Sequence, residues 1–537
     1  MNDSYIFLNG HVMTGELNHR PASAVAVSEG RIVAVGSEDE VRAWAGPSTE
    51  VIDLKGRTIA PGFNDAHCHP MYVGFGLQQV NASTPPNVTI SDIVTRIADR
   101  VRETPSGTWV MARGYDQARL AENRHPSRHD FDPVSPNNPV VVVRACGHIA
   151  VANSRALALA GITRDTPNPD GGTIDRDEHG EPTGVLREAA LTMARSVVAD
   201  PSPEQIHDAL LLAGKQYRSM GVTSVAEAGI RTPAEFQAYQ GLAEAGKLPL
   251  RTYLMMMIDE TLEPLSQLGI RTGFGDPWLR IGPAKIFLDG SIGGRTARMS
   301  QPYEDEDDNL GLWMQDPQLM KSKLKAAHKA GFQCCAHAIG DAAIELLIRS
   351  FEEAMQEAPR PDPRHRIEHS SILRPDLIDR IQKIGAIPIP GTSFLYAFKN
   401  AYVQNLGMDR IRYAYAMRTF FERGIIAPAS TDAPVVSTSA MIGIQTMVTR
   451  RSEEGDEIWP EERISLEQAV RAYTYNGAYA SFEEKIKGTI EPGKLADLVV
   501  LETDLRDVRP EELGSVNVDL TIIEGNIVYN RETANGA

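Results

Sequence analysis

Two histidines separated by one residue stand in the segment Asn64-Asp65-Ala66-His67-Cys68-His69-Pro70. The apolar run over residues 58–63 precedes them and is typical of a β-strand. On a strand, residues i and i+2 share a face, so the imidazoles of His67 and His69 can reach one metal ion. The alternative is that both are ordinary core or surface histidines. Side chains further along the chain decide between these interpretations.

Further side chains with metal-binding chemistry fall at the ends of predicted strands. His337, His369 and Asp432 end three apolar runs, and a fourth run carries Lys285 and ends at Asp289. In a barrel of parallel strands, functional side chains lie at the carboxyl ends of the strands. Four histidines and one aspartate at such positions therefore favour a metal site. Imidazole and carboxylate ligands without thiolates suit Zn²⁺, although Mn, Fe, Co or Ni would fit the same set.

The central part of the chain, residues 59–484, is predicted to position these groups. Its apolar runs predict eight strands, at residues 58–64, 222–228, 250–257, 281–288, 332–336, 365–369, 386–390 and 425–430. Amphipathic stretches between them predict helices, for example at residues 204–220, 233–246, 317–331 and 341–357. This alternation indicates parallel strands and an α/β fold of the (β/α)₈ TIM-barrel type.

The interval between the first two predicted strands, residues 70–221, is too long for one crossover connection. It contains two apolar runs of its own, at residues 108–113 and 139–144. We therefore predict that this interval is an insertion after strand 1. Insertions at that end of a barrel lie over the active site.

Both ends of the chain have the pattern of short strands and turns. Apolar runs flank Asn9-Gly10, Glu29-Gly30 and Glu524-Gly525, which predicts hairpins. Neither end has enough strands to close a core by itself. We therefore predict that residues 1–58 and 485–537 together form one small, composite β-sandwich domain.

Composition excludes several classes of protein. The 537 residues are 42% hydrophobic and 23% charged, as in ordinary globular proteins. A formal net charge of −17, without a Lys/Arg run, disfavours nucleic acid and anionic membranes as partners. The four cysteines include no Cys-x-x-Cys pair, and neither a signal peptide nor a spanning apolar segment is evident. A cytoplasmic location is therefore expected.

Several longer motifs resemble a known family. The leader 56–69, with His337, His369, Asp432 and the tail 488–497, resembles the metal-dependent amidohydrolase superfamily. Within it, the chain resembles the YtcJ-like (amidohydrolase-3) branch, which includes N-substituted formamide deformylases. The motifs typical of that branch stand at residues 113–116, 147–157, 184–188, 285–291 and 337–341.

The resemblance implies a (β/α)₈ barrel with a small β-sandwich, and hydrolysis of an amide or another C–N bond by metal-activated water. It implies one or two divalent ions, with Zn²⁺ expected, and ligands at His67, His69, His337, His369 and Asp432. Asp432 can take a proton from the water and give it to the leaving amine. His369 or His148 can hydrogen-bond the carbonyl oxygen. Barrels of this family are often dimers, so a homodimer is expected.

Lys285 determines the expected number of metal ions. In members with two metals, a lysine of the fourth strand is carboxylated by CO₂ and bridges the ions, and we predict such an N6-carboxylysine at Lys285. Two alternatives remain. Lys285 is a structural or substrate-facing lysine, or Asp289 or Glu188 fills the bridging position instead.

Seven side chains are predicted to line the pocket of a small-molecule amide substrate: Tyr115, Asp116, His148, Glu188, Asp289, Ser291 and Arg295. The alternative is that these are solvated loop residues, with Glu188 a carboxylate at a helix start. Asp65, on the same strand face as the two histidines, is expected to orient a ligand.

The predicted function is hydrolysis of an N-acyl or N-formyl amide. The alternative on the same scaffold is a deaminase or a cyclic-amide hydrolase. A barrel that has lost catalysis and acts as a binding protein is disfavoured, because the set of metal ligands is complete.

Overall fold

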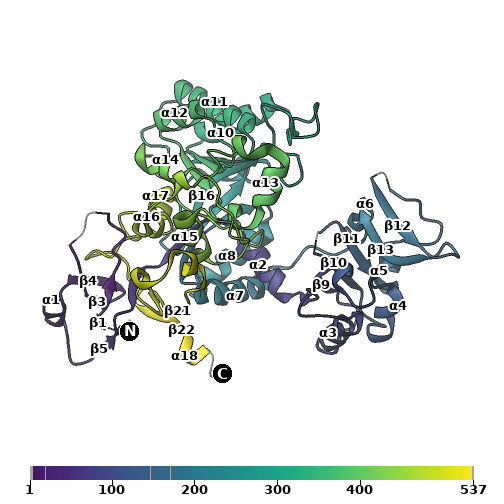
Figure 1. Cartoon of the computed structure of the whole chain (residues 1–537), viewed down its shortest axis with the longest axis horizontal. Helices are drawn as coiled ribbons and strands as arrows, with labels where there is room; N and C mark the ends of the chain where they lie inside the picture. The colour runs from purple at the N-terminus through teal and green to yellow at the C-terminus, as the bar shows by residue number, and fades with distance from the viewer. Residues whose placement is uncertain (1–3, 18–19, 146, 170, 535–537) are drawn as a thin grey trace. The chain divides into compact units, whose positions relative to one another are not determined.

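The computed structural model describes residues 4–17, 20–145, 147–169 and 171–534 (Figure 1). Residues 1–74 and 206–537 belong to one compact unit, and residues 75–205 form a second. The first unit contains the predicted metal ligands, and it is described first.

Seven parallel strands form the central sheet of the first unit. Their spatial order is β19-β18-β17-β16-β15-β14-β7, and each pairs in parallel with its neighbour. The strands are β7 (Phe63–Cys68), β14 (Val222–Ile230), β15 (Arg251–Met257), β16 (Leu279–Phe287), β17 (Cys334–Ala338), β18 (Arg366–His369) and β19 (Ile387–Pro390). Almost every residue in them is buried, as expected for a parallel sheet that helices cover. The sheet is a nearly closed, TIM-barrel-like α/β structure.

The predicted eighth strand, residues 425–430, is not a regular strand. Ser430 makes a single parallel bridge with Gly391, while the carbonyl of Ala429 accepts a hydrogen bond of 3.3 Å from Ala66 of β7. The segment thus lies between the two outermost strands of the sheet. Pro428 has no N–H, and the N–H of Ala429 donates to Ala472, so a continuous ladder cannot form.

Helices alternate with these strands. The four predicted helices are confirmed as α7 (Pro203–Ser219), α8 (Pro233–Glu244), α10 (Pro317–Lys329) and α11 (Asp341–Glu357). The others of the barrel are α2 (Pro70–Gln78), α9 (Ile258–Gln267), α12 (Pro375–Ile384), α13 (Phe394–Arg410), α14 (Met417–Glu422), α15 (Ala440–Thr449), α16 (Leu466–Ala472) and α17 (Tyr475–Ala480). α8 begins with a capping box between Thr232 and Glu235, which satisfies amides of its first turn.

Two smaller sheets contain the strands of the chain ends. The first has the order β4-β3-β1-β5, with β1 (Tyr5–Leu8), β3 (Ala24–Ser28), β4 (Arg31–Gly36) and β5 (Glu50–Asp53). The second has the order β2-β6-β20-β21-β22, with β2 (His11–Val12), β6 (Thr58–Pro61), β20 (Leu498–Leu501), β21 (Val518–Ile523) and β22 (Asn526–Asn530). Phe7, Val25, Ile59, Leu498 and Ile522 belong to one buried cluster. Strands from both chain ends therefore share a sheet and a core.

Two of the three predicted hairpins are confirmed. Glu29-Gly30 joins β3 to β4 and Glu524-Gly525 joins β21 to β22, each with positive φ at both turn residues, as a type I′ turn requires. The hairpin predicted at Asn9-Gly10 is wrong, because β1 and β2 belong to different sheets. Asn9 instead donates its side-chain N–H to Asp53 at 3.0 Å, and the chain crosses between the sheets there.

The run predicted as one strand over residues 58–64 is two strands. β6 ends at Pro61 in the five-stranded sheet, and β7 begins at Phe63 in the barrel. Gly62 joins them where a Cβ atom would lie 2.2 Å from the Cγ2 atom of Thr223. A larger residue at position 62 would therefore clash with the side chain of Thr223 on β14.

The second unit contains a six-stranded sheet of order β12-β13-β11-β10-β9-β8. Its strands are β8 (Val80–Asn81), β9 (Val110–Tyr115), β10 (Val140–Arg144), β11 (Ile149–Ala152), β12 (Gly172–Arg176) and β13 (Pro182–Glu188). Its helices are α3 (Ile90–Glu103), α4 (Arg128–Phe131), α5 (Ser154–Leu159) and α6 (Ala189–Arg195). The strands predicted at residues 108–113 and 139–144 are confirmed as β9 and β10.

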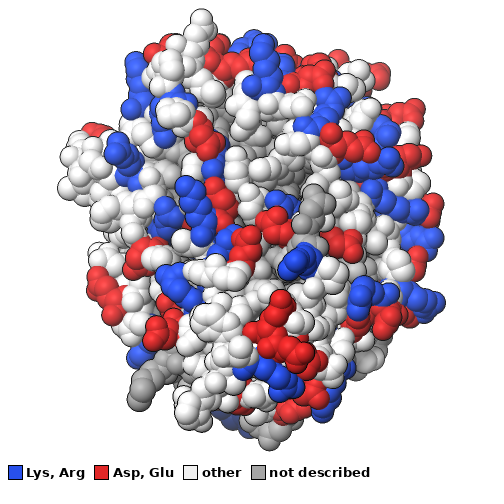
Figure 2. Space-filling view, turned by 90° about the vertical axis from the view of Figure 1, so that its left-hand side faces the viewer, with Lys and Arg blue, Asp and Glu red and all other residues white. Residues whose placement is uncertain are grey.

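Figure 2 shows basic and acidic side chains interspersed over one face of the molecule. Among the described residues, no helix is both long and apolar enough to cross a membrane.

Two buried histidines, His328 of α10 and His365 directly before β18, form a chain of hydrogen bonds. Nδ1 of His365 accepts the backbone N–H of Cys334 at 2.9 Å, and its Nε2 lies 2.8 Å from Nδ1 of His328. Nε2 of His328 in turn lies 2.7 Å from the carbonyl oxygen of Ala358, to which it donates. Each ring therefore has one N–H and one lone pair, so both histidines are neutral in the folded state.

Acid is expected to destabilise the protein through this pair. Burial lowers the pKa of both rings, and that of His365 lies well below its usual range. The unfolded chain binds a proton at each ring near pH 6.5 while the folded chain does not, so stability falls as the pH falls. The free energy of unfolding, measured by urea titration, should fall between pH 7 and pH 5 by about 2 kcal/mol less in His365→Gln than in the wild type.

His179 provides the control, because its side chain is 78% exposed. His179→Gln should keep the pH dependence of the wild type. An unchanged dependence in His365→Gln would contradict the neutral pair.

Candidate metal centre

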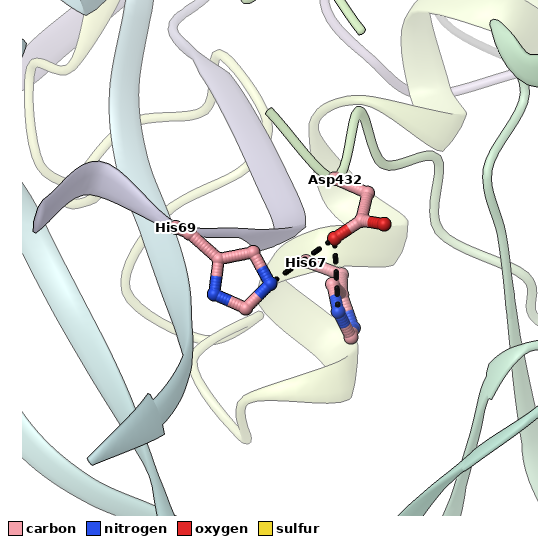
Figure 3. A group of neighbouring side chains, drawn as sticks. All are labelled: His67, His69 and Asp432. Carbon is pink, nitrogen blue, oxygen red and sulfur yellow. Dashed lines mark ion pairs between the residues drawn. The ribbon is translucent and has the colours of Figure 1, made fainter. Parts of the chain in front are cut away.

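His67 lies in β7 and His69 directly follows its last residue, and both rings point towards Asp432 (Figure 3). Their Nε2 atoms lie 3.5 Å and 3.2 Å from one oxygen, Oδ1, of Asp432. The three side chains form a group whose ligand atoms all lie within 4.8 Å of one another. Ligands at about 2.0–2.2 Å from a tetrahedral Zn²⁺ lie about 3.4 Å apart, so these separations fit a metal ion.

Asp432 reaches this position from the segment that replaces the eighth strand. Its backbone N–H donates to the carbonyl of His67 at 2.7 Å. Its φ is 58°, and that of His369 is 69°, so both residues adopt the left-handed backbone region. Such conformations cost energy for residues other than glycine and cluster at functional sites.

Asp65 holds the segment before Asp432. One carboxylate oxygen accepts the backbone N–H groups of Thr431 at 3.0 Å and His67 at 3.3 Å, and the other accepts the hydroxyl of Thr431. Burial raises the pKa of Asp65 to about 6, although these hydrogen bonds oppose the shift. Asp65 therefore ties β7, which carries His67, to the segment that carries Asp432.

A buried carboxylate fixes the ring of His67. Its Nδ1 atom lies 2.5 Å from Oε2 of Glu368, and Arg366 binds both oxygens of Glu368 at 2.7 Å and 3.0 Å. Because the ion-paired carboxylate only accepts hydrogen bonds, Nδ1 of His67 donates and Nε2 carries the lone pair. Burial lowers the pKa of His67 well below its usual range, so the ring is neutral. Its lone pair faces an oxygen of Asp432, an arrangement that a bound cation stabilises.

His69 lies between two carboxylates. Burial lowers its pKa, but Asp432 and Glu227 oppose this and raise the pKa of His69 to about 9. Its Nδ1 atom lies 3.7 Å from Oε1 of Glu227 on β14. At this pKa the His69 ring carries an additional proton at neutral pH. A metal cation that replaced this proton would face the same two carboxylates, those of Asp432 and Glu227.

His369 and His337 extend the cluster along the strand ends. The centroid of the His369 ring lies 4.6 Å from that of His67 and 4.5 Å from that of His337. Burial lowers the pKa of His337 to about 4 and that of His369 well below its usual range. Nε2 of His337 lies 2.8 Å from the carbonyl of Gly290 and donates to it, which leaves Nδ1 with the lone pair. Both rings are thus neutral.

Lys285 is fully buried on β16, and its Nζ atom has no hydrogen-bond partner among the described residues. Its Nζ atom lies 5.1 Å from the ring centroid of Phe287. Burial lowers the pKa of Lys285, while the charge of Glu368 opposes the shift. An amine buried without partners costs stability, and this cost suggests a ligand or a modification.

The loop that follows β16 uses its predicted pocket residues in internal contacts. Asp289 accepts backbone N–H groups from Ile339, Gly340 and Arg298 at 2.8–3.0 Å, and burial raises its pKa to about 7. Arg295 binds Asn405 at 2.9 Å and Glu306 at 2.6 Å. The hydroxyl of Ser291 accepts the N–H of Gly294 at 3.1 Å. These contacts order the loop.

The other predicted pocket residues belong to the second unit, at one end of the strands β9, β11 and β13. The hydroxyl of Tyr115 lies 3.0 Å from Nδ1 of His125, and Asp116 accepts a hydrogen bond of 2.8 Å from Arg144. Nδ1 of His148 lies 3.0 Å from Oε2 of Glu188, and both side chains are more than half exposed. Figure 1 draws this unit without a determined position relative to the first.

Three residues of the centre are absent from the sequence-based prediction: Arg366, Glu368 and Glu227. Arg366 and Glu368 occupy alternate positions of a buried strand. Two opposite charges in such a strand are unusual, and this pattern could have indicated in the sequence that both residues belong to the site. Glu227 likewise lies in a strand that is otherwise apolar or neutral. A charged residue inside such a strand needs a partner, but the sequence does not show which one.

Comparisons with known proteins agree with this architecture. A family model described as "Amidohydrolase family" matches residues 50–529. YtcJ of Bacillus subtilis, which carries the name of an amidohydrolase, is 31% identical over 516 residues, covering 95% of this chain and 96% of YtcJ. The N-substituted formamide deformylase of Arthrobacter pascens is 31% identical over 547 residues, 98% of each chain. The crystal structure of an uncharacterized metal-dependent hydrolase from Pyrococcus furiosus has a TM-score of 0.78 and 27% identity, covering 95% of this chain and 100% of that one.

A nearly closed barrel of parallel strands, with imidazoles and a carboxylate gathered at their carboxyl ends, is the architecture of an α/β-barrel enzyme. The family model spans most of the sequence, and two relatives match over nearly their full length. The chain therefore belongs to the amidohydrolase family, and it is a hydrolase with a candidate His/His/Asp metal site.

Proposed function

We propose that this hydrolase is metal-dependent and cleaves the C–N bond of an N-acyl or N-formyl amide. One observation carries the proposal: the Nε2 atoms of His67 and His69 converge on Oδ1 of Asp432, while the other ring nitrogen of His67, Nδ1, is hydrogen-bonded to Glu368. The name of the related N-substituted formamide deformylase supports the choice of bond.

His67, His69 and Asp432 would hold the ion, with His337 and His369 as further ligands and Zn²⁺ as the metal. When bound, such an ion lowers the pKa of a coordinated water and polarises a carbonyl oxygen. The neutral state of His67, His337 and His369 supports this role, because only unprotonated imidazole can bind a metal.

Asp432 is the proposed general base and acid. The attacking water adds its oxygen to the amide carbon and loses a proton to the carboxylate of Asp432. The same proton then passes to the amide nitrogen, the C–N bond breaks, and a carboxylic acid and an amine leave. Alternatively, if His369 is not a ligand, its neutral ring would donate an N–H to the carbonyl oxygen as negative charge develops there.

Lys285 is proposed to be carboxylated and to bring a second ion into the site. Its buried amine has no partner and a lowered pKa, both of which favour reaction of the neutral amine with CO₂. Asp289 is a weaker candidate for the bridging group, because three backbone N–H groups already occupy its oxygens.

Metal analysis of the purified protein together with a substrate screen tests the proposal. The expected result is two equivalents of divalent metal, a carbamate signal after exposure to ¹³CO₂, and release of free amine from N-formyl amines or N-acyl amino acids. One equivalent of divalent metal per chain, without a carbamate signal, would overturn the assignment of Lys285 as a carboxylated lysine. Release of ammonia, or turnover of lactams alone, would replace amide hydrolysis by the deaminase or cyclic-amide alternative.

A further inference from the structure

Glu227 is a fully buried carboxylate beside the candidate metal centre that the proposed reaction does not use. It lies on β14 opposite Cys68, the residue between His67 and His69, in the register of the paired strands. Its neighbours on β14 are apolar or small, so nothing on that strand neutralises its charge. A buried charge of this kind is stabilised only by specific partners.

The two oxygens of Glu227 differ in their surroundings. Oε2 accepts the hydroxyl of Tyr239 on α8 and, at 3.3 Å, the backbone N–H of Met71. Oε1 has no hydrogen-bond partner among the described residues. The carboxylate is therefore held at one oxygen and directs the other towards His69.

His69 presents the complementary atom. Its Nδ1 is buried without a hydrogen-bond partner in the described structure, and it lies 3.7 Å from Oε1 of Glu227. Its Nε2 atom faces Asp432. Two unpartnered buried groups, a donor and an acceptor, thus face each other slightly beyond hydrogen-bond distance, and a small ring rotation would join them.

We propose that Glu227 is the positioning residue for His69, holding its Nδ1–H so that Nε2 is presented to the metal. This assignment rests on the proposed metal centre. It gives each histidine of the His-x-His motif its own orienting carboxylate: Glu368 of β18 for His67, and Glu227 of β14 for His69. Tyr239 and the amide of Met71 hold Glu227, so α8 and the start of α2 support the site as well. Carboxylates behind metal-binding histidines typically increase metal affinity 10–100-fold.

Zn²⁺ affinity, measured by competition with a chelator, tests this assignment on the whole protein. Glu227→Met removes the acceptor and should weaken Zn²⁺ binding by about 10–100-fold. Glu227→Gln keeps an acceptor oxygen without the charge and should weaken binding less. If Glu227→Met fails to fold, Glu227→Gln and Tyr239→Phe carry the test, and each should accelerate Zn²⁺ loss to the chelator.

Glu235 supplies a matched control, because it is also a buried carboxylate, at the start of α8. It accepts the backbone N–H groups of Arg231 and Thr232 at 2.6 Å and 3.0 Å and is the partner of the N-cap Thr232 in the capping box of α8. Glu235→Gln should lower thermal stability and leave Zn²⁺ affinity unchanged. A merely structural role for Glu227 would give its variants this same pattern, and that result would overturn the assignment.

Glu368→Gln separates this inference from the proposed function. Weak binding in Glu368→Gln with wild-type binding in the Glu227 variants would reject the positioning role and leave the metal centre in place. Absence of Zn²⁺ binding by the wild type would reject the metal centre itself, and the role of Glu227 with it.

Discussion

Replacing Asp432 by Asn is expected to lower kcat for amide hydrolysis by about 10³-fold. The amide has nearly the same shape as the carboxylate, but it cannot accept a proton, and it removes the negative charge that both Nε2 atoms face. Because the variant also loses a charged ligand, kcat has to be measured at saturating Zn²⁺, with the metal content of each sample determined in parallel.

Asp456 offers a surface carboxylate as the control for this substitution. It is 54% exposed and pairs with Lys399 at 2.6 Å. Asp456→Asn should keep wild-type kcat and metal content. Full hydrolysis by metal-loaded Asp432→Asn would show that another group moves the proton.

Substituting Met for Arg366 is expected to lower the free energy of unfolding by about 3–5 kcal/mol. The guanidinium is buried, binds both oxygens of Glu368, and donates to the carbonyl of Ala66 at 2.6 Å. Its removal leaves an unpaired carboxylate and an unsatisfied carbonyl inside the barrel. Urea unfolding of metal-free protein measures this cost without a contribution from bound metal.

A double variant, Arg366→Met with Glu368→Gln, tests the cause of that loss. Neutralising Glu368 removes the buried charge, so the double variant should be more stable than Arg366→Met alone. It should still bind metal weakly, because the orientation of His67 depends on the carboxylate. Equal stability of the single and double variants would mean that lost packing, not the unpaired charge, causes the destabilisation.

The barrel of parallel strands was predictable because its apolar runs and helices alternate regularly. The prediction of an eighth regular strand at residues 425–430 was wrong. The apolar composition of this segment does not reveal that Pro428 and Ala429 cannot take part in a continuous ladder of hydrogen bonds. The prediction of a single strand at residues 58–64 was wrong for another reason. Gly62 marks a crossing between two sheets, and only the approach of Thr223, distant in sequence, shows why it is there.

The candidate ligands were predictable because period-2 spacing and strand ends are local features. The groups that orient them were not. Glu368 reaches His67 across 301 residues, and Glu227 reaches His69 from a neighbouring strand, so both contacts depend on tertiary structure. Asp289 was predicted as a ligand or substrate contact from its position at a strand end, but its backbone partners Ile339 and Gly340 come from another loop and no local pattern indicates them.

The left-handed backbone at His369 and Asp432 affects how relatives of this protein should be compared. Aspartate, asparagine and histidine tolerate that conformation better than other residues with side chains, and glycine tolerates it best. Backbone geometry and metal chemistry therefore select the same residue types at these two positions. A homologue that had lost its metal would still be under pressure to keep them, so their conservation alone is poor evidence that the homologue is an active enzyme.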